Sequence, residues 1–202
     1  PLNLGTPVAR NQVTQRRITQ TGSSNLGPVI TDVSNDPAVP GAAEGVKVRA
    51  RIVDPDGVGS ATVNYSISDP SAAPATAAMT RVAGTDFFEA SLPGQPVGTR
   101  VVFFVTATDS GGRSGRYPVD ITARTHPMVL NPPAASLNDQ RYCIYRHDVK
   151  NPSTGYHNYR FWMTQAKENE LSSRQLHSND PVEGSFVFGS SYMYHESFIR
   201  FG

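Results

Sequence analysis

The sequence predicts a mainly β protein in which a β-sandwich is followed by a small, incomplete α+β region. Two observations carry this prediction. Apolar and polar residues alternate at a period of two along several short segments, as they do in strands that bury one face. Turn-forming Gly, Pro and Asp residues separate these segments at a spacing of roughly ten residues, which is typical of a sandwich.

Residues 1–27 are polar, and they are predicted to form an arm or linker that ends at a Gly-Pro turn signal. Two interpretations of the arm stay open. It is either a disordered segment, or an extended strand around Val13 to Ile18 that docks on a neighbouring copy or on missing parts of the same polypeptide. The predicted sandwich follows and spans residues 28–125.

The clearest strand signal is the unbroken alternation of residues 45–53. One side of this strand is apolar and the other carries three cations, so we expect one buried and one solvated face. The apolar side is formed by Val46, Val48, Ala50 and Ile52, and the cationic side by Lys47, Arg49 and Arg51.

The other predicted strands have the same character, and they are placed at 28–33, 60–67, 85–92, 99–109 and 116–123. Residues 99–109 are rich in β-formers and lack a breaker, which indicates a central strand, whereas Pro118 favours an edge position. Residues 54–60 and 109–115 are predicted turns, and 68–78 a small-residue exposed loop. The predicted core comprises Val48, Ile52, Val63, Tyr65, Phe88, Leu92, Phe103 and Val105.

A Pro- and Asn-rich connector is predicted at 126–140, and the α+β region at 141–202. Within that region we expect a strand at 141–147 and a hairpin formed by 184–189 and 191–201. Residues 159–175 begin like a strand and turn helical, with Thr164 as the N-cap.

The segments VKVRARIVDPDGVGSATVNYSI, FFEASLPG and GTRVVFFVTATDSGGRSG resemble the immunoglobulin/fibronectin-III-like modules of large bacterial surface and secreted proteins. This likeness implies an immunoglobulin-like sandwich in the broad sense, without the Cys…Trp…Cys signature of antibody domains. It also implies an extracellular or cell-surface location. Such sandwiches serve as spacers and as binders, so the likeness does not choose between these roles.

The C-terminal segments YRFWMTQA (159–166), SSR (172–174), SNDPVEGSFVFG (178–189) and IRFG (199–202) resemble the start of the spore coat protein H (CotH-like) kinase family. In that family a strand leads into a helix and then a hairpin, and the catalytic and metal-binding acids follow well downstream. The likeness therefore implies a kinase-like parent protein and no active site within these residues. Because the chain begins at Pro1 rather than Met, we expect it to be processed or part of a longer protein.

The composition excludes several classes of protein. The chain has 202 residues with 18 Lys+Arg and 17 Asp+Glu, a net charge of +1, whereas a nucleic-acid-binding domain is normally strongly basic. No apolar run reaches the length of about 18 residues that a membrane-spanning helix needs. The single cysteine, Cys143, lies in an apolar-aromatic run and is predicted to be a buried, inert thiol.

Asp54, Asp56 and Asp109 are the candidate metal-ligating residues, because an immunoglobulin-like topology places their two loops at the same end of the sandwich. Three converging carboxylates are suited to Ca²⁺, which prefers oxygen ligands. The competing interpretation is that all three are turn formers that bond their own backbone. No other cofactor and no catalytic residue is predicted. The five histidines lack paired ligand spacing, and Ser172-Ser173 lacks the glycines of a nucleophile elbow.

Aromatic residues are dense after residue 140, and they either build a small core or form a surface that binds protein or carbohydrate. Three functional hypotheses follow from the sequence. The first is a non-catalytic segment that spaces or presents neighbouring modules or assembles with other copies. The second is the N-terminal part of a CotH-like protein kinase. The third is a carbohydrate- or calcium-binding module.

Overall fold

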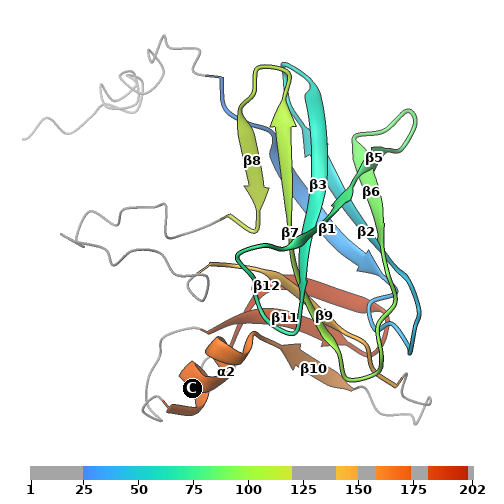
Figure 1. Cartoon of the computed structure of the whole chain (residues 1–202), viewed down its shortest axis with the longest axis vertical. Coiled ribbons are helices and arrows are strands. Elements are labelled where there is room, and N and C mark those ends of the chain that lie inside the picture. Colours follow the sequence, from blue (N-terminus) through green and yellow to red (C-terminus); the bar gives the residue numbers. More distant parts are fainter. Residues whose placement is uncertain (1–24, 120–139, 150–157, 174–181, 200–202) are drawn as a thin grey trace, which may run out of the picture.

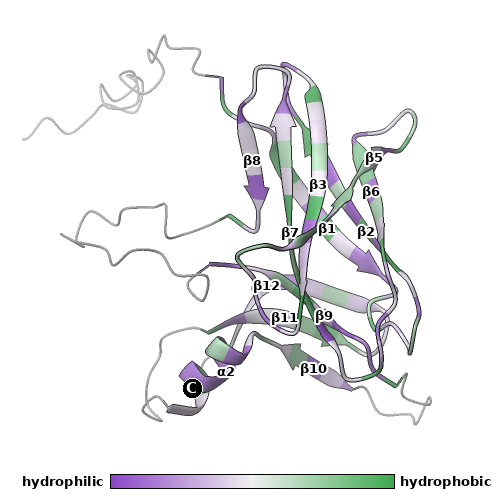
Figure 2. Cartoon of the chain, in the orientation of Figure 1, coloured by the Kyte–Doolittle hydropathy of each residue, from purple (hydrophilic) through white to green (hydrophobic). Residues whose placement is uncertain are grey.

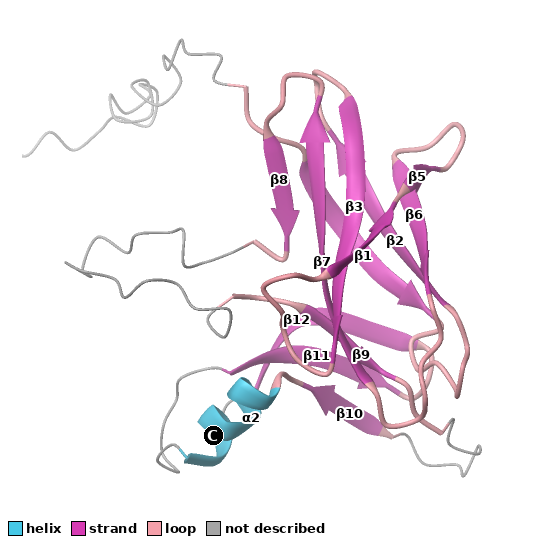
Figure 3. Ribbon diagram, viewed as in Figure 1, coloured by secondary structure: helices cyan, strands magenta, loops and turns pink. Residues whose placement is uncertain are grey.

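The computed structural model describes residues 25–119, 140–149, 158–173 and 182–199 (Figure 1). These residues form three antiparallel sheets and one helix, so the protein is mainly β, a sandwich with a small helical part, as the sequence predicts (Figure 3). Nearly all of the predicted arm and connector lies outside the described residues, as do His126, His157 and His177.

Two sheets form the sandwich, and a third lies at one end of it (Figure 1). In order across the first sheet, the strands are β1 (Val29–Asp36), β2 (Val46–Val53), β6 (Phe87–Leu92) and β5 (Thr80–Arg81). The second sheet contains β4 (Ala75–Ala78), β3 (Val58–Ile67), β7 (Arg100–Asp109) and β8 (Ser114–Tyr117), with β9 (Cys143–Arg146) also paired to β7. The third contains β10 (Tyr159–Trp162), β11 (Val182–Phe188) and β12 (Tyr192–Ile199), and helix α2 (Gln165–Ser173) follows β10.

Strand β2 confirms the predicted alternation, with every second side chain buried from Val46 to Ile52. Figure 2 shows apolar and polar residues alternating in the same way along the sandwich strands. On the exposed side, Lys47 and Arg49 flank Glu89 of β6, at N–O distances of 3.4 and 3.8 Å. Mutual repulsion of the cations is therefore reduced by a carboxylate on the neighbouring strand.

The predicted core is confirmed with one exception. Val48, Val63, Phe103 and Val105 are completely buried between the two sheets, and Ile52, Phe88 and Leu92 nearly so. Tyr65 packs against this core but is only partly buried. The two sheets thus face each other through the apolar sides that the alternation assigns.

Two predicted elements need correction. The segment 68–78 is not wholly a loop, because Ala75–Ala78 forms β4 and pairs with β3. Its Ala and Thr residues show no alternation, but they satisfy backbone groups along the edge of the long strand β3. The last sandwich strand is β8, which starts earlier than predicted and ends at Tyr117. The next residue, Pro118, has no N–H with which to continue the ladder.

The predicted strand at 141–147 exists as β9, but its pairing partner is a strand of the sandwich. Residues 105–108 of β7 pair with β8, and residues 100–103 of the same edge pair with β9. Through β9 the third sheet joins the sandwich core, to which Trp162 and Val187 belong and against which Met193 packs.

Replacing Phe103 with alanine should lower the free energy of unfolding by about 3–5 kcal/mol, because a completely buried ring leaves a cavity. Denaturant unfolding of the full chain measures this change. Val29→Ala is the matched control, since Val29 is 58% exposed and should change stability by less than about 0.5 kcal/mol. An unchanged unfolding midpoint for Phe103→Ala would show that Phe103 is not a core residue.

Candidate functional site

The structure brings Asp54, Asp56 and Asp109 together at the end of the sandwich where β7 finishes. A carboxylate oxygen from each of the three lies within 4.8 Å of one from the others. Two turns hold them there. The Asp56 N–H donates to Oδ1 of Asp54 at 2.8 Å, and the Arg113 N–H donates to Oδ1 of Asp109 at 2.8 Å. The proximity predicted for these loops is therefore present, and Ca²⁺ binding by them stays a prediction.

Asp109 is the most enclosed of the three, with 4% of its surface exposed. Burial by itself would raise the pKa of Asp109, but hydrogen bonds from the Arg113 backbone and the Asn25 side chain outweigh burial. The pKa of Asp109 is therefore lowered, and the carboxylate is ionised at neutral pH. Its Oδ2 and the Oδ2 of Asp54 are both buried without a hydrogen-bond partner among the described residues.

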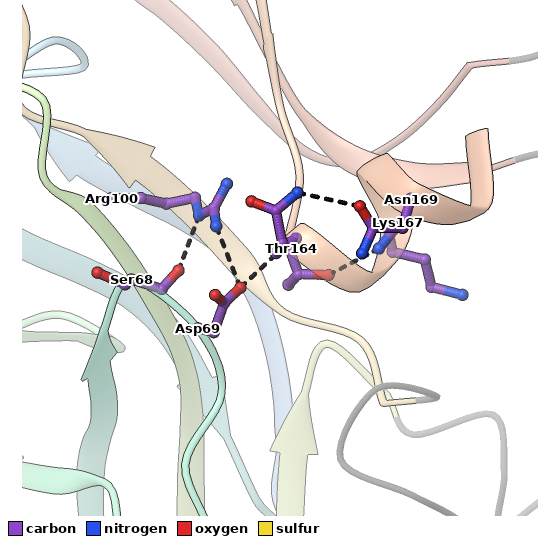
Figure 4. Close-up of polar contacts among 7 residues, drawn as sticks. Ser68, Asp69, Arg100, Thr164, Lys167 and Asn169 are labelled. Atoms are coloured by element: carbon purple, nitrogen blue, oxygen red, sulfur yellow. Dashed lines mark hydrogen bonds and ion pairs between the residues drawn. The ribbon is translucent and has the colours of Figure 1, made fainter. Parts of the chain in front are cut away.

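A second polar cluster joins the sandwich to helix α2 (Figure 4). Arg100, at the start of β7, donates to the Ser68 carbonyl at 2.7 Å and to Oδ1 of Asp69 at 3.1 Å. The same Asp69 oxygen accepts the Gln165 N–H at 2.9 Å. Asp69 thus places a negative charge at the N-terminus of α2, where the helix dipole favours it.

Thr164 is the N-cap of α2, as predicted. Its hydroxyl accepts the Lys167 N–H at 3.3 Å and its carbonyl accepts the Glu168 N–H at 3.0 Å. Sequence pattern alone locates this cap, whereas the contribution of Asp69 from a loop of the sandwich has no signal in the helix sequence.

A cavity of about 610 Å³ lies beside this junction. The residues that line it include Arg100, Arg146, Trp162 and Glu168. Arg100 is already bonded to Ser68 and Asp69, and among the described lining residues no nucleophile is hydrogen-bonded to a general base. The geometry offers polar contacts but not the paired groups that acid–base or nucleophilic catalysis requires.

The outer face of the third sheet carries a row of aromatic side chains, here called the aromatic face: Tyr159, Phe186, Phe188, Tyr192 and Tyr194. The ring centroids of Tyr159 and Phe186 are 6.0 Å apart and those of Phe186 and Tyr194 are 6.4 Å apart, both pairs in stacked orientation. The three tyrosines are 57–65% exposed. This part of the aromatic-rich tail is therefore a surface rather than a core.

The inner face of the same sheet makes a buried polar connection to β9. Ser185 is completely buried, and its hydroxyl accepts the Ile144 N–H at 2.9 Å. The same hydroxyl lies 2.9 Å from Nδ1 of His195. Burial lowers the pKa of His195 to about 3, so the imidazole is neutral. The sequence indicates this inward position. Side chains alternate between the two faces of a strand, so His195 points away from the face that carries Tyr192 and Tyr194.

Other candidates from the sequence have structural roles. Cys143 is completely buried in β9, as predicted. Nδ1 of His147 lies 2.8 Å from the Gly41 carbonyl and its ring is completely buried, so it is a structural histidine. Ser172 and Ser173 lie in α2, where their hydroxyls donate to the carbonyls of Glu168 and Glu170.

Comparison with known proteins identifies no family for this chain. No protein-family model matches the chain, and no curated protein matches it. Helix α2 has nine residues, and no helix in the described part of the chain has the length and apolarity to cross a membrane.

The neutral His195, a partly exposed residue whose Nε2 is buried, makes stability depend on pH. Below pH 6.5, the ordinary pKa of histidine, the unfolded chain binds a proton that the folded chain does not bind until about pH 3. The free energy of unfolding should therefore fall between pH 6.5 and 4.5, by up to about 1.4 kcal/mol per pH unit from this group. Asp109 contributes little in this window, because the unfolded carboxyl takes up its proton around pH 3.8 and the folded one, with its lowered pKa, only below that.

Urea unfolding at several pH values between 4.5 and 7.5 measures this dependence. The His195→Gln variant should show a flatter dependence than the wild-type chain, whatever its absolute stability. Equal slopes for the two proteins would mean that His195 is protonated in the folded state.

Proposed function

We propose that this chain is a non-catalytic structural and interaction segment of a bacterial extracellular or cell-surface protein. In this proposal an immunoglobulin-like sandwich carries a small sheet that assembles with another copy of the chain. The observation that carries the proposal is the aromatic face, which is exposed on one side of a sheet whose other side is buried against the sandwich.

The structural part of the proposal rests on the shared core. Trp162 and Val187 belong to the same buried cluster as Phe103 and Val105 of the sandwich. Polar links reinforce the attachment, including the Arg141–Glu183 ion pair at 2.5 Å and the bond from Ile144 to Ser185. A sheet attached in this way keeps a fixed orientation, which suits a segment that presents a surface.

The interaction part rests on the chemistry of that surface. Tyrosine and phenylalanine supply large contact areas with few rotatable bonds, and tyrosine adds a hydroxyl that bonds at the rim of an interface. Contiguous apolar surface in water generally marks an interaction site. Because the aromatic face is flat and lies on strands, a second copy of the same face is a complementary partner by stacking.

Removing the aromatic face should abolish self-association. We expect the wild-type chain to form a reversible dimer at high concentration in sedimentation velocity, because the face is apolar and self-complementary. The Tyr159→Ser/Tyr192→Ser/Tyr194→Ser variant should sediment as a monomer, close in mass to the 21.8 kDa of one wild-type chain. Val29→Ser is the matched control, since it removes an equally exposed apolar residue from the sandwich. A wild-type chain that stays monomeric at every concentration would disprove the proposed assembly.

The alternative function is the N-terminal part of a CotH-like kinase. It is supported by the order of elements, because β10 leads into α2 and then into the β11–β12 hairpin, as in that family. The matching segments YRFWMTQA and SNDPVEGSFVFG fall largely on these elements. On this alternative the aromatic face is covered by chain that follows residue 202.

Both functions lead to the same expectation for the 202-residue chain by itself. It should transfer no phosphate from Mg²⁺-ATP to a test protein, because the catalytic and metal-binding acids of a kinase are not expected within it. Incubation with labelled ATP and a general acceptor protein checks this. Labelling above the level given by heat-denatured chain would overturn the non-catalytic proposal.

A further inference from the structure

We propose that Asp54, Asp56 and Asp109 bind a Ca²⁺ ion at the end of the sandwich opposite to helix α2. Strand β7 runs from one end of the sandwich to the other: it begins at Arg100, beside α2, and finishes at Asp109 (Figure 1). This site is remote from the aromatic face and does not depend on the proposed function.

The first argument is the gathering of negative charge. Three carboxylates with oxygens within 4.8 Å of one another repel strongly unless a cation lies among them. None of the ion pairs between described residues includes Asp54, Asp56 or Asp109. The side chain that hydrogen-bonds to Asp109 is neutral, since it is the amide of Asn25. Within the described parts of the chain, no side-chain cation therefore compensates this charge.

The second argument is independent of the first and concerns single oxygen atoms. Only 4% of the surface of Asp109 is exposed, and its Oδ2 has no hydrogen-bond partner in the described structure. Oδ2 of Asp54 is likewise buried without a partner. Leaving a buried carboxylate oxygen without a partner is costly, so such oxygens usually coordinate a metal, pair with a cation or bind water.

The two Oδ2 atoms distinguish between the two interpretations of the cluster, a cation site and a pair of turns. Turn formation uses the Oδ1 atoms, which accept the N–H groups of Asp56 and Arg113. It gives no role to either Oδ2, nor to the exposed carboxylate of Asp56. A bound cation uses all three groups, and the two turns then fix the Oδ2 atoms in place for it.

The ligand set favours Ca²⁺ among cations. All of the side-chain donors are carboxylate oxygens, which suit hard cations, and the cluster contains no imidazole or thiolate that would select zinc or copper. Ca²⁺ accepts irregular geometry and completes its six to eight ligands with backbone carbonyls and water. A hollow of about 600 Å³, lined in part by Asp54, Asp56 and Asn25, adjoins the cluster and leaves space for those waters. Mg²⁺ demands a regular octahedron, which two separate loops do not readily provide.

Binding would also stiffen the start of the sandwich. Asn25 lies in the segment that leads into β1, and its side chain bonds to Asp109. An ion held by Asp109 therefore fixes the loops after β2 and β7 and, through Asn25, the segment before β1. We expect ion binding and folding stability to be coupled, since the cluster is assembled only in the folded chain.

The experiment is a titration of the chelator-treated 202-residue chain with CaCl₂. Isothermal titration calorimetry measures the binding, and thermal unfolding measures the change in Tm. We expect saturable binding with a dissociation constant on the order of 10⁻⁵–10⁻³ M. At about one hundred times the dissociation constant, the Tm should rise by roughly 5–10 °C. MgCl₂ in a parallel titration should bind at least about tenfold more weakly.

Asp56→Asn is the decisive variant, because Asp56 is exposed and its side chain makes no hydrogen bond or ion pair with the described residues, whereas its backbone N–H is unaffected by the change. Its Tm without calcium should equal or exceed that of the calcium-free wild type, because one repelling carboxylate is removed, and it should lose the calcium-dependent rise. Asp109→Asn should lose the rise as well, with a lower starting Tm. Asp36→Asn, which removes an exposed carboxylate at the far end of β1, is the matched control and should respond like the wild type.

Either of two results overturns the proposal. The first is the absence of both heat and Tm change in the wild type at 10 times the highest expected dissociation constant, on the order of 10⁻² M. The second is an Asp56→Asn variant that binds Ca²⁺ as tightly as the wild type. Equal affinity for Mg²⁺ would refute the choice of Ca²⁺.

Discussion

The pairing of both edges of β7 is the constraint on which the rest of the structure depends. β3 occupies one edge along nearly the whole strand, while β8 and β9 divide the other. β8 ends at Tyr117 before Pro118, so the first four residues of β7 would present unpaired N–H and C=O groups without β9. Because buried backbone groups need partners, the sandwich has a strand position that β9, from the C-terminal part of the chain, fills.

The attachment of the third sheet follows from that position. Once β9 is paired, its residues Cys143, Ile144 and Tyr145 are buried and provide the surface on which the inner face of β11 and β12 packs. Ser185 then lies beside the Ile144 N–H and accepts a hydrogen bond from it. The neutral imidazole of His195 lies within hydrogen-bonding distance of the same Ser185 hydroxyl. One face of the third sheet is buried in this way. The five residues of the aromatic face are left on the outside.

The two ends of β7 differ in their electrostatics. At Arg100 a cation is matched by Asp69, which in turn faces the positive end of α2, so charges and dipole are balanced. At Asp109 three carboxylates meet and no side-chain cation of the described chain pairs with them. The first end is a completed structural joint, and the second has the electrostatic character of a ligand site.

The sequence by itself determined which residues share a face and where turns and caps lie. β2, β6 and β7 bury the predicted sides, Thr164 caps α2, and the Asp turns stand where turn chemistry places them, because these features depend on neighbours along the chain. Tertiary structure alone decided that Ala75–Ala78 pairs with β3, that β9 joins β7, and that two Oδ2 atoms are buried without partners. Strand pairing depends on which edge is left open by residues distant in sequence, and burial of a single oxygen depends on how two loops meet. A period-two pattern contains neither kind of information.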